Sequence, residues 1–177
     1  LTAASLNVTA GGAVTDSGTL AIAGATTISA SGQDITLDEA ASTFGTLALT
    51  GANVAVTDAG ATDLGASTVS GTLGITSAGA VTDSGTLAIT GATTISASGQ
   101  DITLDEAAST FGTLALTGAN VAVTDAGATD LGASTISGTL GITSAGAVTD
   151  SGTLAITGAT TISASGQDIT LDEAAST

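Results

Sequence analysis

The stretch GAVTDSGTLAI occupies residues 12–22 and recurs letter for letter from Gly79 and again from Gly146. The copies therefore follow a constant period of 67, and the similarity continues through the sequence between them. A fixed internal period of this kind is typical of arrays in which neighbouring units bury one another's apolar faces. The sequence thus predicts a repeat architecture and, with it, a repetitive function.

The two complete copies are nearly identical. They differ at two positions, where Ala23 and Val69 of the first copy are replaced by threonine and isoleucine in the second. Because the chain starts and stops inside a repeat, we expect one continuous array that is a fragment of a longer one. The predicted units are 1–11 (partial), 12–78, 79–145 and 146–177 (partial), within a single domain spanning 1–177.

The composition favours a thin, stacked fold over a globular one. The chain has 177 residues, of which 42% are hydrophobic, yet it contains no Pro, Cys, Met, Trp or Tyr and only two Phe. That apolar content is too high for a disordered chain. With 25 Gly and few large side chains, a globular core would be thin, whereas stacked coils need only small aliphatic residues repeated along an axis.

All the formal charge is negative: sixteen Asp and Glu with no Lys, Arg or His give a net charge of −16. Nucleic acids and anionic membranes are bound by cationic side chains, so the sequence predicts neither as a partner. It contains no apolar run long enough for a transmembrane span, and we expect no membrane insertion. We find no signal-peptide pattern and expect targeting signals to lie elsewhere in a longer protein.

Apolar residues recur two positions apart in short bursts, as in Leu20/Ile22, Ile35/Leu37 and Val54/Val56. Their neighbours are Thr, Ala, Ser and Asp. This alternation indicates strands with one buried face. Gly, Asn, Asp and Ser interrupt it at short intervals, which are too short for helices and suit short strands joined by tight turns. The pattern predicts an all-β parallel β-solenoid, or β-helix.

The number of coils per repeat is open at the level of the sequence. Three coils in each copy give about 22 residues per coil and place apolar residues in three columns, which predicts a three-sided rod of stacked units. An alternative interpretation divides the copy into five two-sided coils of about 13 residues, each opening at a glycine turn. We prefer three sides, because a thin two-sided coil without disulfides buries little. The predicted columns are Leu20, Phe44, Leu64 and Leu87; Ile28, Leu49, Leu73 and Ile95; and Ile35, Val56, Val81 and Ile102.

Over essentially the whole chain, phrases such as GTLAITGATTISASGQDITLDEAASTFGTLALTGANVAVTDAG resemble the repeat regions of large bacterial surface proteins of the filamentous-haemagglutinin-like adhesin type. Members of that group are right-handed β-solenoids displayed as long stalks or fibres. The resemblance implies a right-handed solenoid here, located outside the cell or at its surface. The secretion-signal region of the family has no counterpart in this sequence.

An enzyme is disfavoured by the residue inventory. There is no His, Lys, Cys, Tyr or Arg to serve as a base, a nucleophile partner or an oxyanion clamp. Paired carboxylates can hydrolyse a glycoside, but Asp38 and Glu39 are adjacent and would point to opposite sides of a strand. The same pair also recurs in each copy, whereas an active site is normally single. We predict no catalytic residues and no organic cofactor.

The carboxylates carry one specific hypothesis, because no cationic side chain exists to pair with them. Under the three-coil interpretation, one aspartate per coil would stack as an acidic ladder, where charges about 4.8 Å apart repel by roughly 0.9 kcal/mol in water. Calcium, which binds several carboxylate oxygens, would remove that repulsion. The competing interpretation is that these residues cap turns. The candidate metal ligands are Asp16, Asp38, Asp58, Asp83, Asp105, Asp125, Asp150 and Asp172.

The predicted function is a structural one: an extracellular repeat that serves as a rigid stalk or fibre of a bacterial adhesin or surface filament. Two alternatives stay open, namely a self-assembling filament subunit and a repeated module that binds calcium or glycan. The expected partners are neighbouring repeats or identical subunits stacked end to end, with host or matrix glycans as a further candidate. An ice-binding face made of outward Thr rows is a weaker hypothesis, because the coils are irregular in length.

Overall fold

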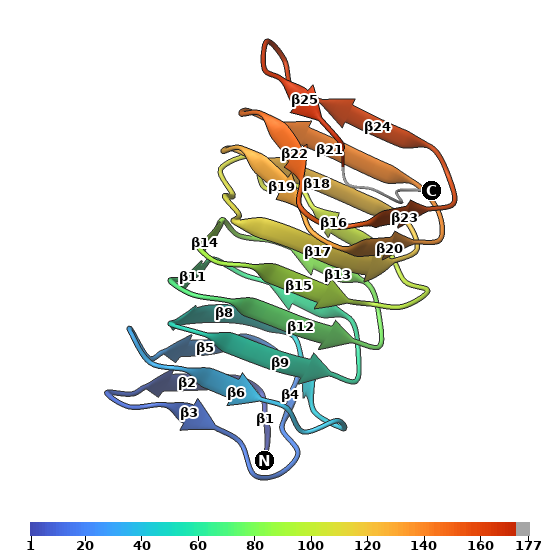
Figure 1. The fold of residues 1–177 in the computed structure, drawn as a ribbon. Helices are drawn as coiled ribbons and strands as arrows, with labels where there is room; N and C mark the ends of the chain where they lie inside the picture. Colours follow the sequence, from blue (N-terminus) through green and yellow to red (C-terminus); the bar gives the residue numbers. More distant parts are fainter. Residues whose placement is uncertain (173–177) are drawn as a thin grey trace.

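The computed structural model describes residues 1–172, which form 25 short β-strands joined by turns. The end of the predicted unit 146–177 lies outside the described residues. Each strand pairs in parallel with a strand about one coil away along the chain. The result is a right-handed β-solenoid of about eight coils, with three faces and about 20 residues per coil (Figure 1). The predicted fold class is thereby confirmed, with a slightly shorter coil than expected.

The three faces are defined by the order in which the chain reaches them. Face 1 contains β1 (Thr2–Ala3), β4 (Ala21–Ile22), β7 (Thr43–Phe44), β10 (Thr62–Leu64), β13 (Val81–Asp83), β16 (Ile102–Leu104), β18 (Val121–Asp125), β21 (Leu140–Ser144) and β24 (Thr160–Ser163). Face 2 contains β2 (Leu6–Thr9), β5 (Thr26–Ser29), β8 (Thr46–Gly51), β11 (Ser67–Val69), β14 (Leu87–Ile89), a single bridge at Thr110, β19 (Thr129–Leu131), β22 (Val148–Asp150) and β25 (Ile169–Thr170). Face 3 contains β3 (Val14–Thr15), β6 (Ile35–Leu37), β9 (Val54–Asp58), β12 (Leu73–Ser77), β15 (Thr93–Ser96), β17 (Thr113–Gly118), β20 (Ser134–Ile136) and β23 (Leu154–Ile156). The hydrogen-bonded sheets cross between these faces at two strands: β8 pairs with both β10 and β11, and β17 pairs with both β19 and β20.

The register of the strands sets the length of each coil, which is the step in residue number between two level positions. Val54 lies level with Leu73, a step of 19, and Leu73 lies level with Thr93, a step of 20. Coils are therefore unequal but stay close to the average. The alternative of thinner, two-sided coils is wrong.

A 67-residue copy does not contain a whole number of these coils. Seven successive strand pairings, β2–β5–β8–β10–β13–β16–β18–β21, lead from the strand at Leu6–Thr9 to its second copy at Leu140–Ser144, so two copies wind about seven times around the axis. The copy between them, at Leu73–Ser77, lies in the other 11-stranded sheet. The expectation of three coils per repeat is corrected to about three and a half, and successive copies face roughly opposite sides of the solenoid.

The core is a column of aliphatic side chains inside the three faces. Strands alternate between buried and exposed positions, so the inward residues of each strand pack against those of the coils above and below. Ile35, Leu47 and Leu87 are each 0% exposed, and the aromatic rings of Phe44 and Phe111 are buried in the same cluster. Within residues 1–172, nothing has the length and apolar character of a membrane-spanning helix.

The corners between faces need small residues, because the backbones of successive coils approach one another closely there. At the corner between faces 2 and 3, the glycine spine consists of Gly71, Gly91 and Gly112. The Gly91 N–H donates to the Gly71 carbonyl at 2.9 Å. A Cβ built on Gly91 would lie 2.5 Å from the Gly71 oxygen, and one built on Gly112 would be closer still to the Gly91 oxygen. The glycine spine therefore excludes any side chain at these positions.

Candidate functional site

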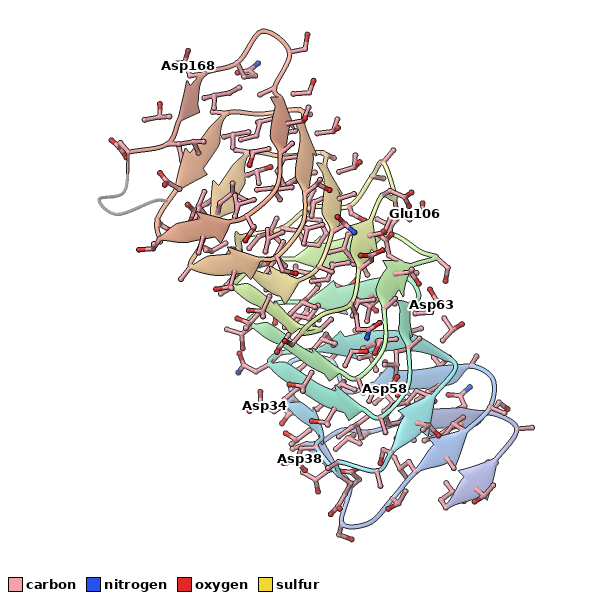
Figure 2. The ribbon with its side chains drawn as sticks, turned by 90° about the vertical axis from the view of Figure 1, so that its right-hand side faces the viewer. Asp34, Asp38, Asp58, Asp63, Glu106 and Asp168 are labelled. Carbon is pink, nitrogen blue, oxygen red and sulfur yellow. The ribbon has the colours of Figure 1, made fainter. Side chains whose placement is uncertain are left out.

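Carboxylates are the only ionisable side chains of this protein, and they are distributed along its whole length. Figure 2 shows the labelled Asp and Glu side chains at successive heights on the solenoid, with no single place where they gather. The aspartates described below occupy three settings that recur with the repeat. The settings differ in whether the aspartate ends a strand pointing inward, lies inside a tight corner, or lies on the outer surface.

The first setting is an aspartate that ends a strand in an inward position, as Asp83 does in β13. Asp83 is 8% exposed. Its Oδ1 accepts the Asp105 backbone N–H at 2.9 Å, and its Oδ2 accepts the Glu106 N–H at 3.4 Å. Burial raises the pKa of Asp83, the two amides lower it, and the negative charges of Asp105 and Glu106 raise it further. The carboxylate thus takes the place of a strand carbonyl where the ladder ends.

The second setting is an aspartate enclosed in a corner, as Asp58 is at the end of β9. Asp58 is 1% exposed. Its Oδ1 accepts the Gly60 N–H at 2.8 Å, and its Oδ2 accepts the Thr62 hydroxyl at 3.2 Å. Burial raises the pKa of Asp58 despite these bonds and a further one from the Phe44 backbone.

The copy of this corner, at Asp125 in the other 11-stranded sheet, has the same partners. Its Oδ1 accepts the Gly127 N–H at 2.8 Å and its Oδ2 the Thr129 hydroxyl at 3.1 Å. Burial raises the pKa of Asp125 as well. At both corners the carboxylate binds a backbone amide of its own turn, which is the capping role that the sequence left open as the competing interpretation.

The third setting is a hydrogen-bonded ladder on the outer surface that sequence reasoning missed. Asp63 Oδ2 accepts the hydroxyls of Thr46, one coil earlier, and Ser84, one coil later, both at 2.8 Å. Separately, the Asn53 side chain donates to Asp34 Oδ1 at 3.0 Å and accepts the Thr72 hydroxyl at 3.1 Å. Each of these bonds joins two neighbouring coils, so only the coil length could have revealed them.

Buried serines form a second group that sequence reasoning missed. Ser109 is 0% exposed and its Oγ accepts the Leu87 N–H at 2.9 Å. The Ser67 Oγ accepts the Leu49 N–H at 3.0 Å and donates to the Gly65 carbonyl at 2.8 Å. Each serine supplies an acceptor where the chain turns away and the backbone ladder is interrupted. Their hydroxyls are therefore engaged in structure and are poorly placed to act as nucleophiles.

The eight aspartates expected to form an acidic ladder are not stacked in one line. Asp58, for example, lies level with Ser77 and not with another aspartate. Successive copies also lie on different faces, which separates their aspartates from one another. Contacts across one coil join Asp38 to Asp16 at 3.1 Å, Asp105 to Asp83 at 2.9 Å and Asp172 to Asp150 at 2.9 Å, in each case from backbone N–H to Oδ1.

Metal binding by these residues has little geometric support. Within residues 1–172, no three or more Asp and Glu side chains are grouped so that they could hold a metal ion. Two carboxylates supply fewer oxygens than the six to eight that calcium takes, so water or backbone carbonyls would have to complete any site. Calcium binding at the aspartate pairs stays a prediction.

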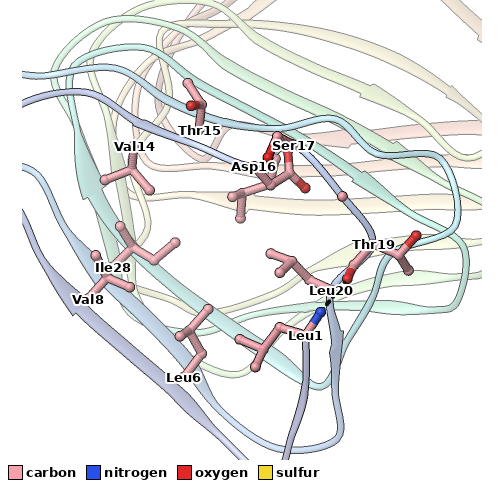
Figure 3. A pocket seen from close by; sticks show the side chains of 12 residues that line it. Leu1, Leu6, Val8, Val14, Thr15, Asp16, Ser17, Thr19, Leu20 and Ile28 are labelled. Atoms are coloured by element: carbon pink, nitrogen blue, oxygen red, sulfur yellow. Dashed lines mark hydrogen bonds between the residues drawn. The ribbon is translucent and has the colours of Figure 1, made fainter.

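A cavity of about 430 Å³ lies at the N-terminal end of the aliphatic column (Figure 3). Its lining is mainly aliphatic, including Leu6, Val8 and Val14, with Asp16 as its single carboxylate. The N-terminal amine of Leu1 lies beside it and donates to the Thr19 carbonyl at 2.8 Å. The cavity is the first section of the solenoid interior, and its lining offers no set of groups for acid–base or nucleophilic chemistry.

Comparison with protein families places the whole chain in one of them. A family described as "Repeats of unknown function (DUF5649)" matches residues 1–50, 51–117 and 118–177. The chain belongs to this family of repeats. The complete match at 51–117 has the same length as the period found in the sequence. Comparisons with curated proteins and with solved structures found no match.

Proposed function

We propose that the chain is a rigid spacer, part of the stalk or fibre of an extracellular bacterial surface protein of the filamentous-haemagglutinin-like adhesin type. The observation that carries the proposal is the parallel pairing of strands in the two 11-stranded sheets, which continues from the first coil to the last around one aliphatic column. The resemblance of the repeat sequence to adhesin repeats supports the surface location.

The mechanism is mechanical. In a solenoid the hydrogen bonds between strands run along the axis, so a pull on the two ends is shared by the backbone bonds of three faces. The aliphatic column excludes water from those bonds, which strengthens them. Strand neighbours lie about 4.8 Å apart, so eight coils extend the chain by roughly 40 Å. Each further copy would add about 17 Å at the same spacing.

Corner chemistry supports a structural role over a catalytic one. The buried carboxylates and serines are bound to backbone amides, as the corners at Asp58, Asp83 and Ser109 show. A group that is already held by the fold has no free position for a substrate. We therefore propose no catalytic activity.

Electron microscopy of the purified chain and of a tandem of two chains tests the spacer function. We expect rods whose length doubles in the tandem, and stepwise extension at high force when a single tandem is pulled from its ends. A flexible coil, or a compact particle whose length does not grow with the number of copies, would contradict the proposal. Long filaments formed by the single chain would instead support a self-assembling subunit.

Surface location and ligand binding need separate measurements. Antibodies against the chain should label intact, unpermeabilised cells of the bacterium that produces it. Binding to a glycan array should be absent for a plain spacer, and saturable binding would favour the repeated glycan-binding module. Labelling that appears only after the cells are permeabilised would contradict the extracellular assignment.

A further inference from the structure

One segment in each complete copy lies where the backbone ladder of the solenoid is interrupted. It covers residues 38–45 in the first copy and residues 105–112 in the second, and we call it the flap. Each flap belongs to the longest coil of its copy, where the step between level positions is 22. Its first part, at 38–42 or 105–109, is a mostly exposed loop that ends in a buried serine.

Below the flap, the strand pairing with the previous coil is short. In the first copy, β7 is two residues long and pairs with β4, and in the second copy a single bridge at Thr110 takes its place. Side chains replace strand pairing in the loop. The Ser42 Oγ accepts the Leu20 N–H at 3.0 Å, and the Asp16 carboxylate accepts the Asp38 N–H at 3.1 Å.

Above the flap, no strand within residues 1–172 pairs with it. The sheet β1–β4–β7 ends at β7, and the stack of β11 and β14 ends at the bridge to Thr110. The next coil holds the first flap through the Ala59 N–H, which donates to the Ser42 carbonyl at 2.7 Å, and through the Asp58 carboxylate, which binds the Phe44 backbone. A backbone amide and a side chain therefore take the place of a strand along this edge.

The two flaps carry the only aromatic residues of the protein, Phe44 and Phe111. Phe44 is 6% exposed and Phe111 is 7% exposed, so each ring is the apolar anchor of its flap in the aliphatic column. A face strand such as β12 is held more firmly, because it is paired on both edges and buries every second residue. A segment with one anchor and few backbone bonds opens at a lower free energy than such a strand.

We propose that the flap is a proteolytic processing site, cleaved after Phe44 and Phe111 by an endoprotease that prefers aromatic residues. Opening brings the Phe44–Gly45 bond out of the solenoid, and water adds across that bond to leave a carboxylate on Phe44 and an amine on Gly45. Proteases that require Lys or Arg find no site, because the chain contains neither. Cuts at both flaps produce the piece 45–111, which is one copy long. This processing goes beyond the spacer function and does not depend on it.

Limited proteolysis of the full chain with chymotrypsin, followed by mass spectrometry of the fragments, tests the proposal. We expect the first cuts in native buffer after Phe44 and Phe111, about ten times faster than any cut after a leucine of the faces, such as Leu49 or Leu73. Because the opening is local, urea below the unfolding transition should change the rate little. First cuts at face leucines, or cleavage that begins only where circular dichroism shows global unfolding, would overturn the proposal.

The variant Ser42→Ala has its control in the same chain. It removes the acceptor of the Leu20 N–H from the first flap only, so cleavage after Phe44 should accelerate several-fold while cleavage after Phe111 keeps the parent rate. Equal acceleration at both sites would show that the whole chain is destabilised and would refute local opening. Electron microscopy of the uncut chain measures the spacer function separately, so rods that resist cleavage at both flaps would refute the processing site alone.

Discussion

The faces and the corners of the solenoid follow different rules. On the faces, alternating aliphatic residues such as Leu73 and Ile75 fill the interior, and almost any aliphatic residue of similar size would do so. At the corners, particular atoms are required: a glycine with no Cβ at position 91, or a carboxylate at position 58 that binds an amide and a hydroxyl. The faces supply most of the stability, whereas the corners determine where each coil turns.

The largest effect is expected on the faces. Ile95→Ala removes a side chain that is 1% exposed in β15 and should lower the free energy of unfolding by about 2–5 kcal/mol, because a cavity stays behind in the column. Thr94→Ala, the outward neighbour in the same strand, should change it by less than about 0.5 kcal/mol. Urea denaturation followed by circular dichroism measures both, and equal losses would show that the column is not the source of stability.

Replacing a corner glycine should cause the next largest loss of stability. Gly91→Ala places a methyl group 2.5 Å from the Gly71 carbonyl oxygen, and shifting two backbones apart should cost about 1–3 kcal/mol. Gly74→Ala is the matched control, because its Cβ would meet only the Val54 oxygen at 3.8 Å. Since glycine weakens a strand, this control should be neutral or slightly stabilising. A destabilised Gly74→Ala would contradict the distinction between face and corner glycines.

Removing a buried hydrogen-bond acceptor should lower the free energy of unfolding by a similar or smaller amount. Ser109→Ala leaves the Leu87 N–H without its partner at 2.9 Å in a buried position, which should cost about 1–3 kcal/mol. Ser98→Ala, in an exposed loop, serves as the control and should be neutral. Hydrogen exchange at the Leu87 amide should accelerate in the first variant alone. Unchanged protection there would show that water or another group replaces the serine.

The buried corner aspartates should make stability depend on pH. Burial raises the folded-state pKa of Asp58 and Asp125 above the ordinary value of 3.8, so between 3.8 and the raised pKa the folded chain binds more protons than the unfolded one. Their contribution to stability is therefore fully present below the ordinary value and is lost as the pH rises through the raised pKa. The free energy of unfolding, measured by urea denaturation, should rise as the pH falls from neutral toward about 4.

Variants assign this pH dependence to particular groups. The double variant Asp58→Asn and Asp125→Asn should flatten the dependence of the melting temperature on pH, since asparagine does not titrate and its oxygen still accepts the corner amide. Asp34→Asn, on the exposed outer ladder, serves as the control. The slope left in the double variant should include the contribution of Asp83, whose pKa is also raised. If the melting temperature of the double variant depended on pH as strongly as that of the parent chain, the corner aspartates would be ruled out as the source of the pH dependence.

Calcium gives the smallest expected effect. If the aspartate pairs such as Asp83 and Asp105 bind the ion, millimolar calcium should raise the melting temperature relative to chelator, because binding to the folded state alone stabilises it. Asp105→Asn should reduce that rise, because it removes one of the three pairs. Identical melting with calcium and with chelator would exclude a calcium-stiffened rod.

The sequence predicted the faces well and the register only in part. The alternation of small strands with glycine-rich turns predicted the parallel solenoid, and Ile28 and Leu49 are level as expected. Each predicted column nevertheless changes face once: Ile28 and Leu49 lie on face 2, whereas Leu73 and Ile95 lie on face 3. The cause is the additional strand in each copy, which an average coil length conceals.

The corners were less predictable, for a physical reason. Whether an aspartate caps its own turn, as Asp58 does, or accepts an amide from the next coil, as Asp83 does, depends on contacts over very different separations along the chain. A pattern in one repeat does not determine the second kind of contact until the coil length is known. The serine acceptors and the outer Asp63 ladder share this property.

The ten-strand copy also affects how such a protein can change its length over generations. Recombination between nearly identical copies of the gene inserts or deletes one whole copy at a time, and every strand beyond the junction still meets the neighbour that it had before. The change in length therefore leaves no strand mispaired. Whatever domain is carried at the distal end is moved by one increment of length and rotated by about half a revolution, so lineages that differ by one copy present that domain in different orientations.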